Sequence, residues 1–181
     1  MPTVKSPARG ISQASKRVFT LFQAHSGFYT FTNLWQIGLY SSNISGNISA
    51  FANLTKLNYL YLSDTQLYGN ISVLTNFPNL KEFSCSLLSE SFKGDISVFA
   101  NKPDLNYINI SQASGITGNI SAFANKTSLK TLYVNYTQVS GSVNSLANNT
   151  NLIKLLVNNT SISYKPGILF FKIWDWYALW R

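Results

Sequence analysis

The sequence predicts a solenoid of the α/β class, in which one short structural unit is repeated along the chain. The segment GNISAFAN begins at Gly46 and recurs unchanged at Gly118, and close variants begin at Gly69, Gly94 and Gly141. These glycines are spaced by 23, 25, 24 and 23 residues. A period of about 20–29 residues is typical of solenoids, because one such unit cannot bury its apolar side alone and must stack on its neighbours.

The apolar residues between the glycines predict one strand per unit. They follow the pattern L-x-x-L-x-L in six units, whose first positions are Leu34, Leu57, Leu80, Leu105, Leu129 and Leu152. The x-L-x-L part alternates with a period of two, as in a strand that buries one face. Stacking of the units then places these strands side by side in one parallel sheet.

The segment after each strand predicts a turn followed by a short helix. Glycine can adopt the positive φ of a sharp turn. Apolar residues two and five positions later suit a 3₁₀ or single helical turn, with the serine of NIS as a candidate N-cap. The later of these two positions forms a column expected to point into the core: Phe51, Leu74, Phe99, Phe123 and Leu146. Two extra residues around Leu87–Glu90 and one near Ala113–Ser114 are expected to bulge without breaking the stack.

From about Phe28 to Ser163 the chain resembles the leucine-rich-repeat family. Its form L-x-x-L-x-L-x-x-T-x-I-x-G-x-I-S is similar to the glycine-containing repeats of plant receptor ectodomains and of bacterial surface proteins. Thr stands where the family usually has Asn, as at Thr65, and Ser stands where the plant form has Pro, as at Ser49; both departures favour the bacterial kind.

The resemblance implies a right-handed horseshoe with a concave parallel sheet of six strands, one for each unit, and short 3₁₀ or helical turns on the convex side. It also implies ligand recognition on the concave sheet and an extracellular or cell-surface location.

The chain divides into three parts. Residues 28–163 form the predicted solenoid, and residues 1–27 form a basic tail, either disordered or a partial cap, in which we recognise no signal peptide. Residues 164–181 are rich in aromatic residues and could cap the solenoid, lie on a membrane surface or be a non-native tail. A cap or a non-native tail is favoured because the segment lacks a polybasic face. A further alternative is that the chain is a fragment of a longer protein.

The net charge of +8 comes mainly from the two tails. Residues 1–30 carry four basic residues and no acid, whereas residues 31–163 carry seven lysines against five acids. The lysines of the solenoid form no run, so nucleic-acid binding is not expected. No stretch reaches the about 18 consecutive apolar residues of a membrane-spanning helix, so no transmembrane span is predicted.

Groups that could carry catalysis are scarce. The single histidine, His25, lies outside the repeats, and the single cysteine, Cys85, occupies an inward strand position. The acids show no recurrent spacing that would make an acid–base pair, and no zinc, calcium or phosphate-binding pattern is present. We therefore expect no enzyme activity, no catalytic or metal-binding residue and no cofactor.

An asparagine recurs seven residues after each repeat glycine, at Asn53, Asn76, Asn101, Asn125 and Asn148. We expect this column to be buried and to satisfy backbone groups of the next coil. The alternative is N-glycosylation, because the pattern N-x-S/T is frequent in the chain. Most matches are by-products of the repeat, so the structural role is favoured.

The outward residues of the predicted sheet form the candidate binding site. The residues two, four and six positions after the first leucine point away from the core and are mainly Tyr, Ser and Asn. Tyrosine offers rigid contact area with a polar tip, and Ser and Asn offer adaptable hydrogen bonds. Tyrosine is also a good strand residue, so a purely structural role is the alternative. The candidate ligand-binding residues are Tyr59, Tyr61, Tyr107 and Tyr133, with Asn109 and Asn135 orienting the ligand and Tyr136 beside them.

The predicted function is therefore a non-catalytic recognition module that binds a protein or a glycan on the concave face. The alternative is a structural spacer or stalk in a larger surface or virion protein. The sequence does not predict the oligomeric state.

Overall fold

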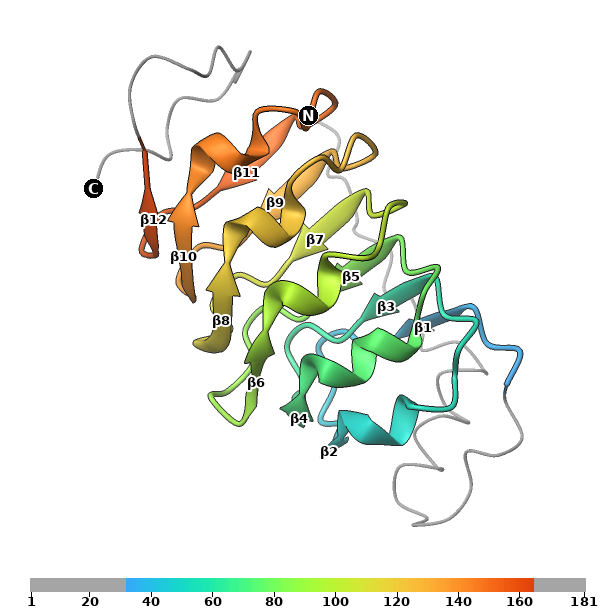
Figure 1. Cartoon of the computed structure of the whole chain (residues 1–181). Coiled ribbons are helices and arrows are strands. Elements are labelled where there is room, and N and C mark those ends of the chain that lie inside the picture. The colour runs from blue at the N-terminus through green and yellow to red at the C-terminus, as the bar shows by residue number, and fades with distance from the viewer. Residues whose placement is uncertain (1–31, 165–181) are drawn as a thin grey trace, which may run out of the picture.

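The computed structural model describes residues 32–164, which form a stack of coils (Figure 1). Each complete coil contains a strand, a second strand and a 3₁₀ helix, in that order along the chain. The predictions for the N-terminal tail, His25 included, and for the C-terminal segment beyond Tyr164 lie outside the described residues. No helix within residues 32–164 has the length and apolar character needed to cross a bilayer.

The first strands of the coils form one parallel sheet, here called the first sheet. Its strands are, in spatial order, β1 (Gln36–Gly38), β3 (Tyr59–Tyr61), β5 (Glu82–Ser84), β7 (Tyr107–Asn109), β9 (Thr131–Tyr133) and β11 (Lys154–Leu156). Equivalent positions of the repeat pair across it, so that Leu60 lies opposite Ile37 on one side and Phe83 on the other. The predicted fold class and the register of the six units are confirmed.

A second parallel sheet runs through the glycine-containing segments. Its strands are β2 (Ser45–Asn47), β4 (Gln66–Asn70), β6 (Phe92–Asp95), β8 (Gly115–Asn119), β10 (Gln138–Ser142) and β12 (Ser161–Ser163), in the same order along the stack. The sequence pattern does not predict this sheet, because its strands are short and offer almost no period-two alternation. In β4, for example, only Leu67 is buried.

The 3₁₀ helices close the third side of the coils. They are η2 (Ile48–Phe51), η3 (Ile71–Asn76), η4 (Ile96–Phe99), η5 (Ile120–Phe123) and η6 (Val143–Leu146). The predicted serine cap is wrong. The cap is the residue that precedes the helix, and in η2 the side chain of Asn47 accepts a hydrogen bond of 2.9 Å from the backbone N–H of Ser49. Asn70, Asp95, Asn119 and Ser142 occupy the same position in the later helices.

The cap of one coil also packs against the glycine of the next. Gly69 has a φ of +117°, and a Cβ built on it would lie 2.5 Å from the Oδ1 of Asn47. The positive φ predicted for the glycine is confirmed. Its lack of a side chain serves a second purpose, since it leaves room for the neighbouring cap.

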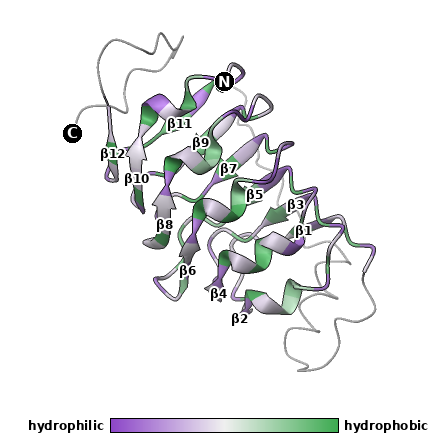
Figure 2. Ribbon diagram, in the orientation of Figure 1, coloured by the Kyte–Doolittle hydropathy of each residue, from purple (hydrophilic) through white to green (hydrophobic). Residues whose placement is uncertain are grey.

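Hydrophobic residues, green on the ribbon of Figure 2, recur from coil to coil along the stack. Their buried side chains form one core cluster that runs along the stack. The predicted inward column of Phe and Leu is fully buried in every coil. Within it the ring of Phe99 stacks on Phe123 with a centroid separation of 5.5 Å and contacts Phe83 at 5.6 Å. Cys85 is also fully buried, and this burial raises the pKa of its thiol above the usual value.

The predicted buried asparagine column is wrong. Asn53, Asn76, Asn101, Asn125 and Asn148 are all exposed. Two of them still contact the preceding coil, since Asn148 donates to Asn125 at 2.8 Å and Asn76 donates to the carbonyl of Ala52 at 3.2 Å. The buried position is the next residue, which is Leu54, Phe77, Lys102, Lys126 and Asn149 in successive coils.

Two of these buried residues are lysines that hydrogen-bond to the coil before them. Lys102 is 3% exposed, and its ammonium donates to the carbonyls of Leu74 and Phe77 at 2.7 and 2.8 Å. Lys126 repeats the arrangement one coil later, donating to Ala100 and Lys102. Desolvation, with a smaller effect from the charge of Lys126, lowers the pKa of Lys102 to about 8. Desolvation also lowers the pKa of Lys126.

Between about pH 8 and pH 10, we expect the free energy of unfolding of the wild type to gain with pH relative to that of Lys102→Leu; Cys85, whose raised pKa acts in the opposite direction, is common to both proteins and cancels in this difference. The folded-state pKa of Lys102 is about 8, below the ordinary 10.5, so in this window the unfolded chain binds more protons than the folded chain. A leucine side chain should fit at position 102, because Leu54 is buried at the equivalent position two coils earlier. The carbonyls of Leu74 and Phe77, which lose the lysine as a donor, each keep a backbone donor. The N–H of Phe77 donates to Leu74, and the N–H of Leu80 donates to Phe77.

Urea unfolding of both proteins at several pH values measures this effect. Lys93→Leu is the control, because Lys93 is exposed on β6 and its ammonium remains in solvent. The same pH dependence of the free energy of unfolding in Lys102→Leu and in the wild type would contradict the prediction.

A non-glycine residue with positive φ ends the first-sheet segment of every coil. The six residues are Ser41, Asp64, Leu87, Gln112, Tyr136 and Asn159, with φ between 44° and 62°. The backbone N–H of Leu87 donates to the carbonyl of Ser111 in the next coil, at 3.1 Å. The extra residues that follow Leu87 leave the order of both sheets unbroken, as predicted.

Leu87→Asn should stabilise the fold by about 1 kcal/mol, because leucine is strained at positive φ and asparagine tolerates it. Leu87 has a φ of 62° and is 54% exposed, so little packing is lost, and Asn159 already occupies the equivalent corner. Thermal unfolding gives the result. A lower melting temperature for Leu87→Asn would show that the exposed leucine contributes packing that outweighs its strain.

Candidate functional site

The outward side of the first sheet carries the candidate site. We call this surface the tyrosine face and define it by the outward positions of β3, β5, β7 and β9 with the residues that follow them: Tyr59, Tyr61, Ser63, Glu82, Ser84, Ser86, Tyr107, Asn109, Ser111, Thr131, Tyr133 and Asn135. On β3, β7 and β9 the central residue is buried while its two neighbours are only half-buried. The predicted orientation of the tyrosines therefore holds.

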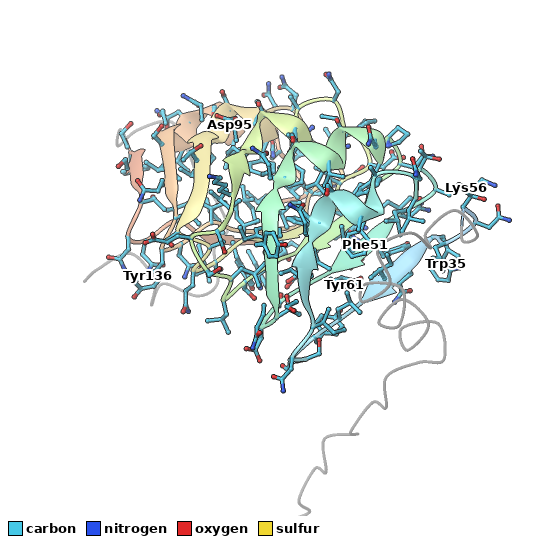
Figure 3. All side chains as sticks on the ribbon, turned by 90° about the horizontal axis from the view of Figure 1, so that it is seen from below. Trp35, Phe51, Lys56, Tyr61, Asp95 and Tyr136 are labelled. Atoms are coloured by element: carbon cyan, nitrogen blue, oxygen red, sulfur yellow. The ribbon has the colours of Figure 1, made fainter. Side chains whose placement is uncertain are left out.

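Tyr59 and Tyr61 lie on β3 within a larger aromatic group. The indole of Trp35 meets the ring of Tyr59 edge-on at 5.6 Å, and Tyr40 stacks on Tyr61 at 5.3 Å. Trp35 is 58% exposed and lies near Tyr61 at the N-terminal end of the stack (Figure 3). We did not predict a role for Trp35. The sequence signal that could have indicated this role is the position of Trp35 directly before the first strand.

Tyr107 and Tyr133 form a second aromatic pair toward the other end. Their rings meet edge-on at a centroid separation of 6.4 Å. Asn109 follows Tyr107 on the same face and lies opposite Tyr133 in the register of the sheet. The structure thus brings these three predicted residues together but separates them from Tyr59 and Tyr61 by one strand, β5.

The intervening strand places Glu82 between the two aromatic groups. In register, Glu82 lies opposite Tyr59 on one side and Tyr107 on the other. The hydroxyl of Tyr61 donates a hydrogen bond to its Oε2. Burial and this hydrogen bond raise the pKa of Tyr61 above its usual value, so the phenol stays a neutral donor. Sequence reasoning did not include Glu82 in the site.

The two remaining predicted residues differ from the others in position. Asn135 is only 9% exposed, and its Oδ1 accepts a hydrogen bond of 2.6 Å from Ser111. Tyr136 is 50% exposed but lies at the positive-φ corner after β9, toward the C-terminal end of the stack and far from Tyr61 (Figure 3). Asn135 therefore supports the surface from within, and Tyr136 borders it.

The polar groups of the tyrosine face fall into two kinds. The hydroxyls of Ser63, Ser84 and Ser111 are hydrogen-bonded within the sheet, and those of Ser63 and Ser84 lie 2.5 Å apart. By contrast, the hydroxyls of Tyr59, Tyr107 and Tyr133 form no hydrogen bond with any residue that the structure describes. The face thus presents rigid rings with unused donors and acceptors above a fixed polar layer.

Metal-ligating side chains do not cluster in the part of the chain that the structure describes. Between residues 32 and 164, no three side chains of His, Cys, Asp or Glu come together as a metal site. The single cysteine of the chain is buried, which raises the pKa of its thiol. The arrangement on the first sheet is suited to binding through rings and hydrogen bonds.

Comparison with solved structures identifies the fold. The Arabidopsis receptor kinase HAESA, solved with the peptide hormone IDA and the co-receptor SERK1, superposes with a TM-score of 0.65 at 21% identity, covering 73% of this chain and 22% of that chain. The plant peptide hormone receptor RGFR1, in complex with RGF2, gives 0.63 at 21% identity, covering 72% and 22%. Internalin C2 of Listeria monocytogenes gives 0.51 at 22% identity, covering 73% and 65%.

The chain has the leucine-rich-repeat fold. No protein-family model and no curated protein sequence matches it. This leucine-rich-repeat chain spans about a fifth of the length of the plant receptor chains that it matches, at 22% of each. Plant and bacterial structures both appear among the similar folds, and these low identities establish the fold alone.

Proposed function

We propose that this leucine-rich-repeat chain is a non-catalytic recognition module that binds an extended protein segment on the tyrosine face. The observation that carries the proposal is the set of four half-buried tyrosines on a parallel sheet, of which Tyr59, Tyr107 and Tyr133 have hydroxyls without a hydrogen bond to any described residue. Such rings supply large contact area at a low entropic cost, because tyrosine has only two side-chain torsions to fix. The similar plant receptors were solved with peptide hormones, which supports a peptide as the ligand class.

The family resemblance further supports an extracellular or cell-surface location for the module. A structural spacer is the alternative, and it makes a different prediction. For a spacer, changes on the tyrosine face alter solubility or stability and no binding reaction. The two roles can therefore be separated by one set of variants.

The experiment screens the purified chain against peptide and glycan arrays and repeats the screen with Tyr59, Tyr61, Tyr107 and Tyr133 all changed to Ser. Tyr68→Ser is the matched control, because Tyr68 is 47% exposed but lies on β4 of the second sheet. Peptide binding that is lost in the fourfold variant and kept in the control supports the proposal. Binding that survives the fourfold change in a folded protein, binding only to glycans, or no binding at all would each reject it.

A further inference from the structure

The electrostatic character of the tyrosine face is set by one residue. Three outward positions in each of six coils give 18 sites on the first sheet, and Glu82 is the only acid among them. The only basic residue at these positions is Lys154 on β11, three strands away from β5. Glu82 is therefore the single charged residue of the tyrosine face as defined above, and Lys81 and Lys130 directly precede β5 and β9.

The carboxylate of Glu82 is only partly satisfied within the protein. Its Oε2 accepts the hydrogen bond from Tyr61, and Glu82 forms no ion pair with any described residue. Glu82 is half-buried, so its second oxygen, Oε1, stays available at the surface. A carboxylate in this state is a strong acceptor for a charged donor.

Three aromatic rings surround this acceptor. Tyr59 and Tyr107 flank Glu82 on the neighbouring strands, which lie about 4.8 Å away in a sheet. Tyr61 is held beside it by the hydrogen bond. Ring faces attract cations within about 6 Å of their centres, and they stack well on a planar guanidinium. The combination of a carboxylate and three tyrosines is complementary to a cation and unsuited to an anion.

We infer that Glu82, with Tyr59, Tyr61 and Tyr107, forms a subsite for an arginine side chain of the bound peptide. The guanidinium stacks on the tyrosine rings and donates to Oε1 of Glu82. Arginine fits better than lysine, because its planar group can stack and donate at the same time. This inference rests on the proposed function and adds the identity of one ligand residue.

The test compares arginine peptides with citrulline peptides, which have the same shape but no charge. Pairs of ten-residue peptides from the array, identical except for a central arginine or citrulline, are titrated against the full chain. We expect the wild type to bind the arginine member at least about tenfold more tightly, the equivalent of about 1.4 kcal/mol. We expect Glu82→Gln to remove this preference, because it weakens binding of the arginine member far more than binding of the citrulline member.

The Glu82→Gln variant should fold normally, because its amide oxygen can still accept from Tyr61, and its unfolding midpoint verifies this. Glu90→Gln is the control, since Glu90 is exposed in the loop after β5 and its change should leave the preference intact. If peptides bind through the tyrosine face without preferring arginine, or if Glu82→Gln keeps the preference, the arginine subsite is refuted and the proposed function stands. If no peptide binds, both are refuted.

Discussion

Gly118→Ala is expected to lower the free energy of unfolding by about 3 kcal/mol, through backbone strain and overpacking together. Gly118 has a φ of +116°, which side-chain-bearing residues rarely adopt. The new methyl group would also lie 2.6 Å from Oδ1 of Asp95 and 2.8 Å from Cγ1 of Ile96. Asp95 caps η4, and Ile96 is fully buried, so the clash can be relieved only by losing a cap or displacing the core.

Urea unfolding measures this loss, and Gly38→Ala is the matched control. Gly38 does not have a positive φ, and among the described residues a Cβ there would meet Tyr40 at an ordinary 3.4 Å. Its substitution should change the free energy by less than about 1 kcal/mol. Similar unfolding midpoints for the two alanine variants would mean that the coils can separate slightly without cost and that the cap does not pack firmly on the glycine.

Phe99→Ala is expected to destabilise the protein by about 3–5 kcal/mol, the usual cost of removing a buried phenylalanine ring. Phe99 has no exposed surface and lies between Phe83 and Phe123, so the cavity would open at the centre of the stack. The neighbouring coils hold these rings on both sides and limit how far the cavity can collapse. Thermal and urea unfolding should both report the loss.

Phe99→Leu provides the comparison, because the preceding coil has Leu74 at the same place in the column. Its cost should stay below about 1.5 kcal/mol, as is usual when an apolar residue is replaced by another of similar volume. If alanine and leucine at this position were equally harmful, ring stacking along the column would matter more than the volume that the ring fills.

The repeating part of the fold could be predicted because its determinants recur in sequence. Ile37, Leu60 and Phe83 occupy the same template position and pair with each other in the sheet. The second sheet could not be predicted in this way, since its strands are held by backbone pairing and bury few side chains. Lys102 gave no local signal either. Only the apolar residues that precede it in its column, Leu54 and Phe77, indicated a buried position.

The candidate site was predictable to a similar extent. Period-two alternation was enough to place Tyr59, Tyr107 and Tyr133 outward. It could not show that Asn135 is nearly covered, because this burial depends on contacts with the adjacent coil. The central place of Glu82 follows from the register, which was available from the repeat. Its significance depends on the hydrogen bond from Tyr61, which the sequence does not reveal.

The contact between a helix cap and the next glycine has a consequence for how such a chain can evolve. Asn47 fits against Gly69, and Asn119 fits against Gly141. Every contact of this kind therefore pairs the helix cap of one coil with the glycine of the next coil. A tandem duplication or deletion of one whole coil again places a cap against a glycine. An insertion or deletion of half a coil places a cap against a residue that has a side chain. The array can therefore grow or shrink in whole units, which would lengthen or shorten its reach along a ligand without any change to the core.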